Sequence, residues 1–511
     1  MNYFSIKNSL LSFIILKRIK KINQFIENPI KYQKNIFNYL LKKGLKTKFG
    51  EEHYLRKIND YKAFKNQIPI RTYEEFEPYI QRIRKGEKNV LWPGEVKWFA
   101  KSSGTTNHKS KFIPITKESL KDCHFKAGKD MLSLYENNFK KTTVYKGKGI
   151  MLGGSISKST NEKHIDGDLS AILLKEFPFW VNHHRIPDID TALMKEWDNK
   201  LEKIAKQAIN TNITNLTGVP SWMLILLKRV LRLSGKKNIL EIWPNLELYM
   251  HGGVNFDPYR KQFQELIPSN NMNYLEGYNA SEGFFAIQDK KPSKGMLLML
   301  NYGIFYEFIP MEQYRQGKKN AINLSEVKLN KQYALVITTN GGLWRYLIGD
   351  VIEFTTLTPF RIKILGRTKS YINTFGEELM VHNTDTAIKK SCAKYNCSIT
   401  DYTVAPIFID NNSGGHQWFI EFSKKPLNLK LFMKEIDCQL KQLNTDYEAK
   451  RTENLIIKFP ELVVIENNEF YFWLKENDRL GGQYKIPRLS ANRDIAERLI
   501  SIKRSFQQNS D

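Results

Sequence analysis

Apolar residues up to about position 365 occur in two alternating patterns, short continuous runs and longer stretches with helical spacing. Continuous runs at 149–152, 246–250 and 333–339 predict strands buried on both faces, and a glycine pair closely follows each run. Residues 222–233 (WMLILLKRVLRL) predict a largely buried helix. Because strands alternate with helices, we expect an α/β fold with mainly parallel sheets, whose ligands lie beyond the carboxyl ends of the strands.

The pattern changes after Gly366-Arg367, where the apolar runs become shorter. The elements expected there are strands at 403–408, 418–422, 462–465 and 470–474 and helices near 383–395 and 427–445. This mixture predicts a smaller α+β domain. We therefore expect two domains, residues 1–365 and 366–511; the family resemblance described below implies that the second is mobile relative to the first.

Residues 10–16 (LLSFIIL) form an apolar run flanked by basic residues. The run is too short to span a bilayer, which needs about twenty residues, and no small-residue cleavage site follows it. Apolar positions continue at helical spacing as far as Leu40. A packed amphipathic helix is the simple prediction, and a peripheral membrane contact is the alternative. We expect a cytoplasmic chain without integral membrane association.

The composition indicates a globular protein, since 41% of the 511 residues are hydrophobic and 12% are aromatic. The net charge of +26 raises the question of a nucleic-acid partner. Lysines, however, are spread along the chain without a long basic block, so we expect no nucleic-acid partner; a non-catalytic polyanion-binding protein is a distant alternative. The four cysteines match neither a zinc pattern nor a disulfide framework, which favours a reducing, intracellular setting.

The segment 101–114 (KSSGTTNHKSKFIP) is the most informative for chemistry. Four hydroxyl residues surround Gly104, and two lysines follow. Small donors, free backbone N–H groups and cations are what a polyphosphate requires. The spacing is not that of a Walker-type loop. An ordinary polar surface turn is the alternative interpretation.

Two further segments carry candidate acidic residues. In the dense polar loop expected within 274–283 (YLEGYNASEG), Glu282 is a possible ligand for a magnesium ion carried by a nucleotide, or an ordinary helix-capping acid. In 344–353 (WRYLIGDVIE), we expect Gly349-Asp350 in a loop that precedes a strand. An aspartate at such a loop can accept both hydroxyls of a ribose.

Taken together and in this order, these segments resemble the adenylate-forming enzymes, and more specifically the auxin-responsive (Gretchen Hagen type) acyl-acid amido synthetase family, here as a bacterial-type member. The resemblance spans essentially the whole chain. The matching segments are SSGTT (102–106), YNASEG (278–283), YLIGD (346–350), Gly366-Arg367, GGVNFDPYR (252–260), LNTDYEAKR (443–451) and QYKIPR (483–488).

The resemblance implies a role for particular side chains. It makes Lys485 and Glu282 catalytic, with Glu282 also the magnesium ligand, and it places Val219, Trp222 and Met223 in the wall of the acyl pocket. The residues it assigns to ATP binding are Ser102, Ser103, Gly104, Thr105, Thr106, Gly252, Gly253, Tyr278, Asn279, Ala280, Ser281, Asp350 and Arg367.

The resemblance also implies an activity. The expected enzyme uses ATP and Mg²⁺ to convert a carboxylic acid into an acyl-AMP, and then transfers the acyl group to an amine, expected to be an amino acid. An acyl-CoA ligase of the same superfamily is the main alternative, because it shares every ATP-binding feature and differs in the acceptor. The acid, the acceptor and the oligomeric state are not specified by these motifs.

Overall fold

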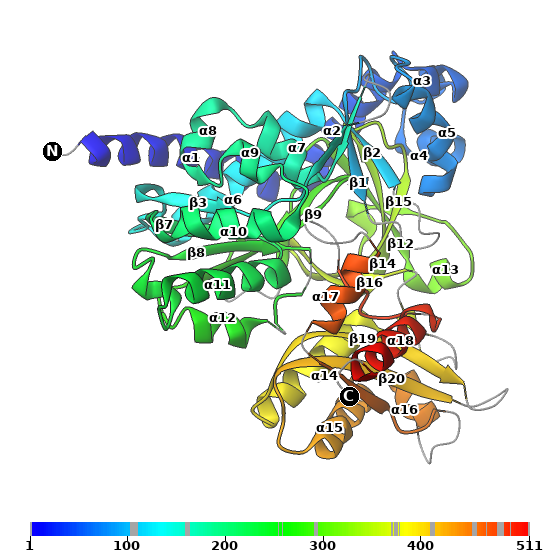
Figure 1. Ribbon diagram of the computed structural model, residues 1–511. Coiled ribbons are helices and arrows are strands. Elements are labelled where there is room, and N and C mark those ends of the chain that lie inside the picture. The colour runs from blue at the N-terminus through cyan, green and yellow to red at the C-terminus, as the bar shows by residue number, and fades with distance from the viewer. Residues whose placement is uncertain are drawn as a thin grey trace. The chain divides into compact units, whose positions relative to one another are not determined.

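The computed structural model describes residues 3–102, 111–158, 164–253, 255–257, 259–290, 295–368, 371–372, 377, 379–408, 414–451, 457–466, 468–477, 485–490 and 492–508. The chain folds into two compact units (Figure 1). The first unit comprises residues 1–253 and 269–363, and the second comprises 254–268 and 364–511. The chain therefore leaves the first unit twice, once near the expected boundary at residue 366 and once, unexpectedly, after Gly253.

The amphipathic N-terminal segment forms two helices, α1 (Tyr3–Glu27) and α2 (Pro29–Gly44). Pro29 occupies the first turn of α2, where its missing N–H removes no helical hydrogen bond. Ile22 and Leu40 are buried, as the spacing predicts. Within the part of the chain that the structure describes, no helix combines the length and apolar character needed to cross a membrane.

Shorter helices follow before the first strand, and others connect the strands of the first unit. They are α3 (Lys48–Glu52), α4 (Tyr61–Gln67), α5 (Tyr73–Arg84), α6 (Phe125–Asn138), α7 (Leu169–Glu176), α8 (Phe179–His183), α9 (Ile189–Ala192), α10 (Trp197–Ile209), α11 (Pro220–Ser234) and α13 (Met311–Arg315). The expected buried helix at 222–233 is the main part of α11, which ends at Gly235 in the left-handed conformation (φ +67°).

The main sheet of the first unit contains twelve strands among the described residues. In spatial order they are β13 (Ile322–Asn323), β12 (Ile304–Pro310), β14 (Gln332–Thr339), β15 (Tyr346–Leu357), β16 (Phe360–Arg367), β11 (Met296–Leu298), β10 (Gly283–Ile287), β9 (Asn273–Ala280), β8 (Leu248–Gly252), β7 (Ile213–Gly218), β3 (Lys148–Met151) and β6 (Arg185–Ile186). The expected strands at 149–152, 246–250 and 333–339 correspond to β3, β8 and β14.

The expectation of mainly parallel pairing is wrong for most of this sheet. Among the described residues, parallel pairing in this sheet is confined to the run β6-β3-β7-β8-β9. The pairs β13-β12, β12-β14, β14-β15, β16-β11, β11-β10 and β10-β9 are antiparallel. The physical reason is the length of the connections. Parallel neighbours need a crossover such as α11, whereas β9 and β10 are joined by a two-residue turn.

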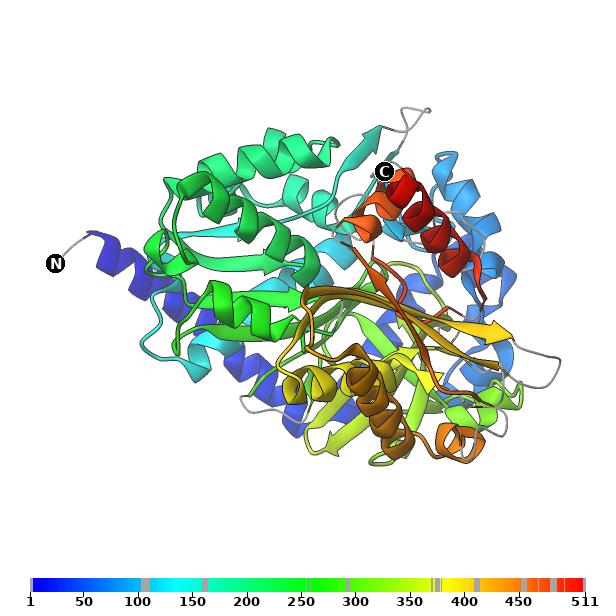
Figure 2. The same ribbon diagram turned by 60° about the horizontal axis from the view of Figure 1, so that its bottom comes forward.

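Helices cover both faces of the parallel part of the sheet. Figure 2 shows α10 and α11 on one face and α1 on the other. Beside this sheet, a four-stranded sheet has the order β2 (Lys111–Ile115), β1 (Trp98–Ser102), β5 (Ile165–Gly167) and β4 (Ile156–Lys158). Strand β1 thereby places the start of the Ser/Thr/Gly-rich segment at one end of a hairpin.

The second unit contains a three-stranded sheet of β19 (Ser398–Phe408), β20 (Gly414–Lys424) and β21 (Glu461–Ile465), and a two-stranded pair of β17 (Tyr371–Ile372) and β18 (Leu379–Met380). Its helices are α12 (Arg260–Leu266), α14 (Val381–Lys394), α15 (Leu429–Leu443), α16 (Thr445–Arg451), α17 (Glu469–Glu476) and α18 (Asp494–Gln508). The expected α+β character of this region is present.

The strand expected at 470–474 is a helix, α17. The segment FYFWL is continuously apolar and aromatic, a composition typical of strands. Its buried positions are Phe470, Trp473 and Leu474, which have helical spacing. A short apolar run cannot reveal its period when the outward positions are apolar as well, and Phe472 is in fact 41% exposed.

Candidate nucleotide and acyl site

The parallel strands β7, β8 and β9 end in register at the same edge of the sheet, where Gly218 pairs with His251 and Gly252 pairs with Gly277. A Cβ atom at position 252 would lie 2.3 Å from the Gly277 carbonyl oxygen, so only glycine fits there. Gly253 follows with φ +81°, in the region that favours glycine. The glycine pair therefore produces a tight exit from β8 at the edge where ligands bind in α/β sheets.

Residues 278–282 lie on β9 and on the turn after it, and not in the dense polar loop expected from the sequence. Tyr278, Asn279 and Ala280 belong to β9, and Ser281 and Glu282 form the turn to β10. Strand β9 continues beyond the last residue of β8. Strand pairing therefore holds the YNASEG segment at the carboxyl edge of the parallel strands.

Two hydrogen bonds join this segment to β15. The Tyr278 hydroxyl donates to the Asp350 carboxylate at 2.5 Å, and the Tyr346 hydroxyl donates to the Glu282 carboxylate at 3.3 Å. Both acidic residues assigned from the sequence thus lie in one cluster with a tyrosine partner each. Tyr346 begins the YLIGD segment, but no role could be assigned to it from the sequence.

Asp350 lies inside β15 rather than in a loop before a strand, which corrects the sequence interpretation. The pairing of β14 with β15 shifts here, because Ala334 pairs with Val351 while Val336 pairs with Leu347. Residues 348–350 therefore bulge opposite Leu335 alone. A bulge redirects side chains, and the positive φ of Gly349 (+89°) makes this one possible.

The first half of the WRYLIGD segment is structural. Arg345 is buried, has φ +47°, and donates to both carboxylate oxygens of Glu307 and to the Ile68 carbonyl oxygen. Tyr61 also donates to Glu307, at 3.0 Å. Breaking such a buried pair by removing one partner typically costs about 3–5 kcal/mol, so Arg345 anchors the strand that carries Asp350.

Glu282 is suited to the magnesium role in its surroundings. Its side chain is largely buried, with 9% of the residue exposed. The neighbouring Ser281 Oγ is also buried and has no hydrogen-bond partner among the described residues. Unsatisfied buried polar atoms are uncommon and mark positions completed by a ligand or water. Mg²⁺ carried by a triphosphate retains phosphate and water oxygens, so one carboxylate suffices.

The Ser/Thr/Gly-rich segment is only partly described. Ser102 ends β1 and pairs with Lys111 at the start of β2, in an antiparallel hairpin. Ser103, Gly104, Thr105 and Thr106 lie outside the described residues. Their assignment to ATP phosphates stays a prediction from the sequence.

The residues expected to line an acyl pocket lie at the start of α11, which follows β7. Val219 precedes the first turn of α11. Trp222 and Met223 are buried, and the Trp222 ring packs edge-on against Trp197 with centroids 4.7 Å apart. Thr217 Oγ1, at the end of β7, is buried without a hydrogen-bond partner among the described residues, so it is a polar candidate that the sequence did not single out.

A buried lysine supports the neighbouring strand end and was missed from sequence. Lys200 on α10 donates to the carbonyl oxygens of Gly153 and Gly154, at 2.7 Å each. Burial lowers the pKa of Lys200 to about 8, and the nearby Asp168 opposes that shift. In the sequence, Lys200 is one of many lysines on an amphipathic helix, so nothing in the pattern distinguishes it.

Arg367 and Lys485 belong to the second unit, and each is described within that unit. Arg367 ends β16 immediately after Gly366, whose φ is +151°. Lys485 begins the described segment 485–490. The predicted roles, ATP binding for Arg367 and catalysis for Lys485, stay predictions.

The fold is shared with two ligases of known structure. A 2-hydroxyisobutyryl-CoA ligase, solved in the postadenylation state with an acyl-AMP, superposes with a TM-score of 0.60 at 12% identity over 92% of each chain. An acyl acid amido synthetase, GH3.15, superposes with a TM-score of 0.76 at 18% identity over 95% of each chain. These superpositions, at low sequence identity, show a shared fold.

The family follows from the sequence itself. The GH3 family N-terminal, central and C-terminal domains match residues 18–272, 297–367 and 382–494. The chain therefore belongs to the GH3 family. Relatives include the indole-3-acetic acid-amido synthetase GH3.4 of Arabidopsis thaliana, 23% identical over 93% of this chain and 91% of the relative. Another is the jasmonoyl-L-amino acid synthetase JAR6 of Nicotiana attenuata, 22% identical over 92% and 93%.

Proposed function

We propose that the protein is an ATP-dependent ligase that adenylates a carboxylic acid and transfers the acyl group to an amine, in particular an amino acid. The observation that carries this proposal is a set of two hydrogen bonds, Tyr278 to Asp350 and Tyr346 to Glu282. Both lie at the edge of the parallel strands in a chain of the GH3 family. We further propose Mg²⁺ as the cation, the cytoplasm as the location, and no nucleic-acid partner. We also propose that the boundary near residue 366 separates an ATP- and acyl-binding domain from the C-terminal domain.

The first half-reaction makes the acid reactive. A carboxylate oxygen attacks the α-phosphorus of ATP, the bond from that phosphorus to the bridging oxygen breaks, and pyrophosphate leaves. Glu282 would hold the magnesium that neutralises the leaving pyrophosphate, and Asp350 would accept the ribose hydroxyls. Lys485 would stabilise negative charge that develops at the reacting groups. Such preorganised charge contacts are typically worth about 3–4 kcal/mol in the transition state.

In the second half-reaction, the amine nitrogen attacks the carbonyl carbon of the acyl-AMP. The carbon–oxygen bond to the phosphate breaks, AMP leaves, and the nitrogen loses a proton to form the amide. Phosphate is a good leaving group where the free oxide of a carboxylate is not. The protein's contribution is to hold the two reactants in line and exclude water.

The test is a product analysis with a panel of aryl and aliphatic acids. Each acid is incubated with ATP and Mg²⁺, together with the twenty amino acids, with coenzyme A, or with neither. The proposal predicts an acyl amide and AMP in the amino-acid arm. A thioester in place of the amide would instead establish a CoA ligase, and AMP release without any acid would contradict both.

A further inference from the structure

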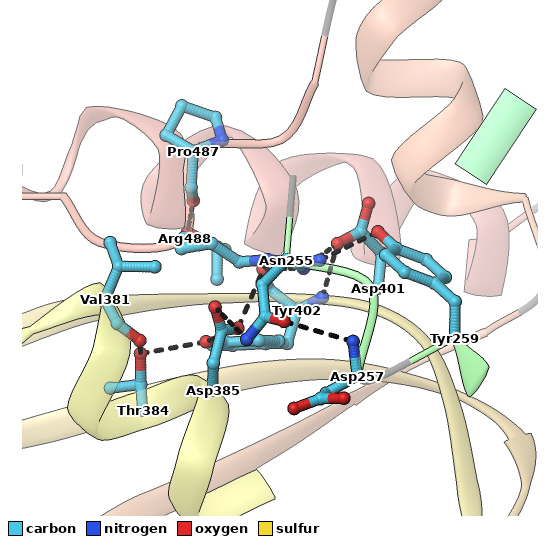
Figure 3. Close-up of polar contacts among 11 residues, drawn as sticks. Asn255, Asp257, Tyr259, Val381, Thr384, Asp385, Asp401, Tyr402, Pro487 and Arg488 are labelled. Carbon is cyan, nitrogen blue, oxygen red and sulfur yellow. Dashed lines mark hydrogen bonds and ion pairs between the residues drawn. The ribbon is translucent and has the colours of Figure 1, made fainter. Parts of the chain in front are cut away.

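Two sequence segments that the proposed mechanism leaves partly unexplained meet inside the second unit. They are GGVNFDPYR, through its residues 255–257 and 259–260, and QYKIPR, through Arg488. The Arg488 guanidinium donates to the Tyr259 hydroxyl at 2.7 Å (Figure 3). Lys485, the proposed catalytic lysine, lies three residues before Arg488 in the chain.

Arg488 is surrounded by acidic and aromatic groups. It forms an ion pair with Asp401, donates to the Tyr402 carbonyl oxygen at 3.2 Å, and lies 3.8 Å from the Asp385 carboxylate. Its guanidinium also stacks over the Tyr402 ring, 4.4 Å from the centroid. The arginine side chain is only 10% exposed. A planar guanidinium with several fixed donors is well suited to bind several acceptors at once.

The carboxylates have partners of their own. Asp385 accepts hydrogen bonds from the Tyr402 hydroxyl at 2.7 Å and from the Asn255 amide at 3.2 Å. Burial raises the pKa of Asp385 and of Asp401, and the charge of Arg488 opposes that rise. Figure 3 shows these side chains converging on the arginine from three separate parts of the second unit. The Arg488 guanidinium contacts a residue in each of these three parts, namely Tyr259, Asp385 and Asp401.

The backbone around Arg488 is attached to β19. The Val404 N–H donates to the Arg488 carbonyl oxygen at 3.0 Å, and the Ser490 N–H donates to the Val404 carbonyl oxygen at 2.9 Å. The Thr403 hydroxyl donates to the Pro487 carbonyl oxygen at 2.6 Å. Pro487 itself has a fixed φ, which stiffens the connection back toward Lys485.

We propose that Arg488 is a positioning residue for adenylation, acting by fixing the backbone from which Lys485 projects. The inference rests on the proposed function. It goes beyond that function because Arg488 makes all of its described contacts with protein groups of the second unit and none of them is a reacting atom. Misplacement of a catalytic group by about 1 Å can reduce a rate on the order of 10²-fold.

The decisive experiment is a double-mutant cycle on acid-dependent ATP–pyrophosphate exchange. Arg488→Lys keeps the charge and loses the planar fork, and it is combined with Lys485→Ala. We expect Arg488→Lys alone to lower kcat on the order of 10²-fold with the KM values for ATP and acid little changed. In the Lys485→Ala background the same substitution should have almost no further effect, because residues that act as a unit are not additive.

Arg451→Lys is the matched control. Arg451 is equally buried in the second unit and binds both carboxylate oxygens of Asp437 at 2.8 Å. We expect Arg451→Lys to lower thermal stability as Arg488→Lys does, while ATP–pyrophosphate exchange by the folded enzyme is unchanged. Hydrogen exchange at the Val404 and Ser490 amides should accelerate in Arg488→Lys alone.

Tyr259→Phe is the second variant, to be used if Arg488→Lys does not fold. It removes one hydrogen-bond acceptor of the arginine, and it should lower kcat by a smaller factor than Arg488→Lys does.

Each result has one meaning. If Arg488→Lys lowers kcat by the same factor in the presence and absence of Lys485, the positioning role is overturned. The same holds if Arg451→Lys lowers kcat as much as Arg488→Lys does. Full activity of Lys485→Ala would overturn it as well, by removing the residue on which Arg488 acts. Absence of acid-dependent exchange in the unaltered enzyme would instead refute the proposed function, and the inference with it.

Discussion

Among the single residues of the site, glycine is required at the edge of the parallel strands because it has no Cβ atom. Gly252 and Gly277 face each other on β8 and β9, and a methyl group at position 252 would overlap a carbonyl oxygen of the neighbouring strand. Backbone atoms cannot move aside as a flexible side chain can. The site therefore depends on glycine at this position for space, independently of any role in binding.

Gly252→Ala is predicted to destabilise the protein by about 1–3 kcal/mol through this overlap and to weaken ATP binding. Thermal unfolding and ATP titration measure the two effects. The matched control is Gly128→Ala on α6, where an added Cβ meets nothing within 4 Å. Alanine there is expected to be neutral or to stabilise by up to about 1 kcal/mol. Equal stability of the two variants would refute the steric account.

The acidic residues of the site could be identified from the sequence, whereas their hydrogen-bond partners could not be identified as such. Glu282 and Asp350 could be singled out because short polar segments interrupt apolar runs, and the family resemblance then implied their roles. The tyrosines that hydrogen-bond them, and the buried Lys200 under the Gly153-Gly154 turn, emerge only from contacts distant in the chain. A local pattern cannot report such contacts.

At the scale of elements, the position of Asp350 depends on an irregularity in a strand. Strongly periodic helices such as α11, and apolar strands such as β14, were predictable because their pattern records burial directly. The bulge at residues 348–350 was not, since it is a property of the pairing of β15 with β14. The sequence therefore indicated a loop where a bulged strand is found.

Gly349→Ala tests the bulge. The φ of +89° is costly for a residue with a Cβ atom, by roughly 1–2 kcal/mol. We expect a corresponding loss of stability and a raised KM for ATP, with the KM for the acid unchanged, because Asp350 would be redirected. Steady-state exchange kinetics separate the two KM values. An unchanged KM for ATP would contradict the assignment of Asp350 to the ribose.

A second element, the π-helical segment Ser119–His124, carries a buried histidine. Burial lowers the pKa of His124 to about 4 from an ordinary value of 6.5. The unfolded chain then binds more protons than the folded one between these values, so stability falls as the pH decreases through that window. The expected loss between pH 7 and pH 5 is about 2 kcal/mol.

Chemical denaturation of the unaltered protein and of His124→Leu at both pH values measures this contribution. The variant should lose about 2 kcal/mol less than the unaltered protein over the same interval, because leucine does not titrate. Identical pH dependence of the two proteins would show that His124 does not contribute.

At the scale of the whole molecule, the chain is interleaved between two compact units. Residues 255–268 lie between β8 and β9 in sequence but fold with the second unit, where the Gln262 amide donates to the Ile399 carbonyl oxygen at 2.7 Å. A single boundary near residue 366 was the natural expectation, because α12 looks like any amphipathic helix in the sequence. Its partners lie more than a hundred residues away, which no local pattern encodes.

Acid-dependent ATP–pyrophosphate exchange, measured for the unaltered protein and for Glu282→Gln, tests the proposed adenylation and its magnesium ligand together. We expect Mg²⁺-dependent exchange only when a suitable carboxylic acid is present, and a fall on the order of 10²–10³-fold in Glu282→Gln without loss of the folded state. Exchange that persists in Glu282→Gln would contradict the assignment of the magnesium ligand. Failure of the unaltered protein to bind ATP or to exchange pyrophosphate with any acid would contradict the adenylation itself.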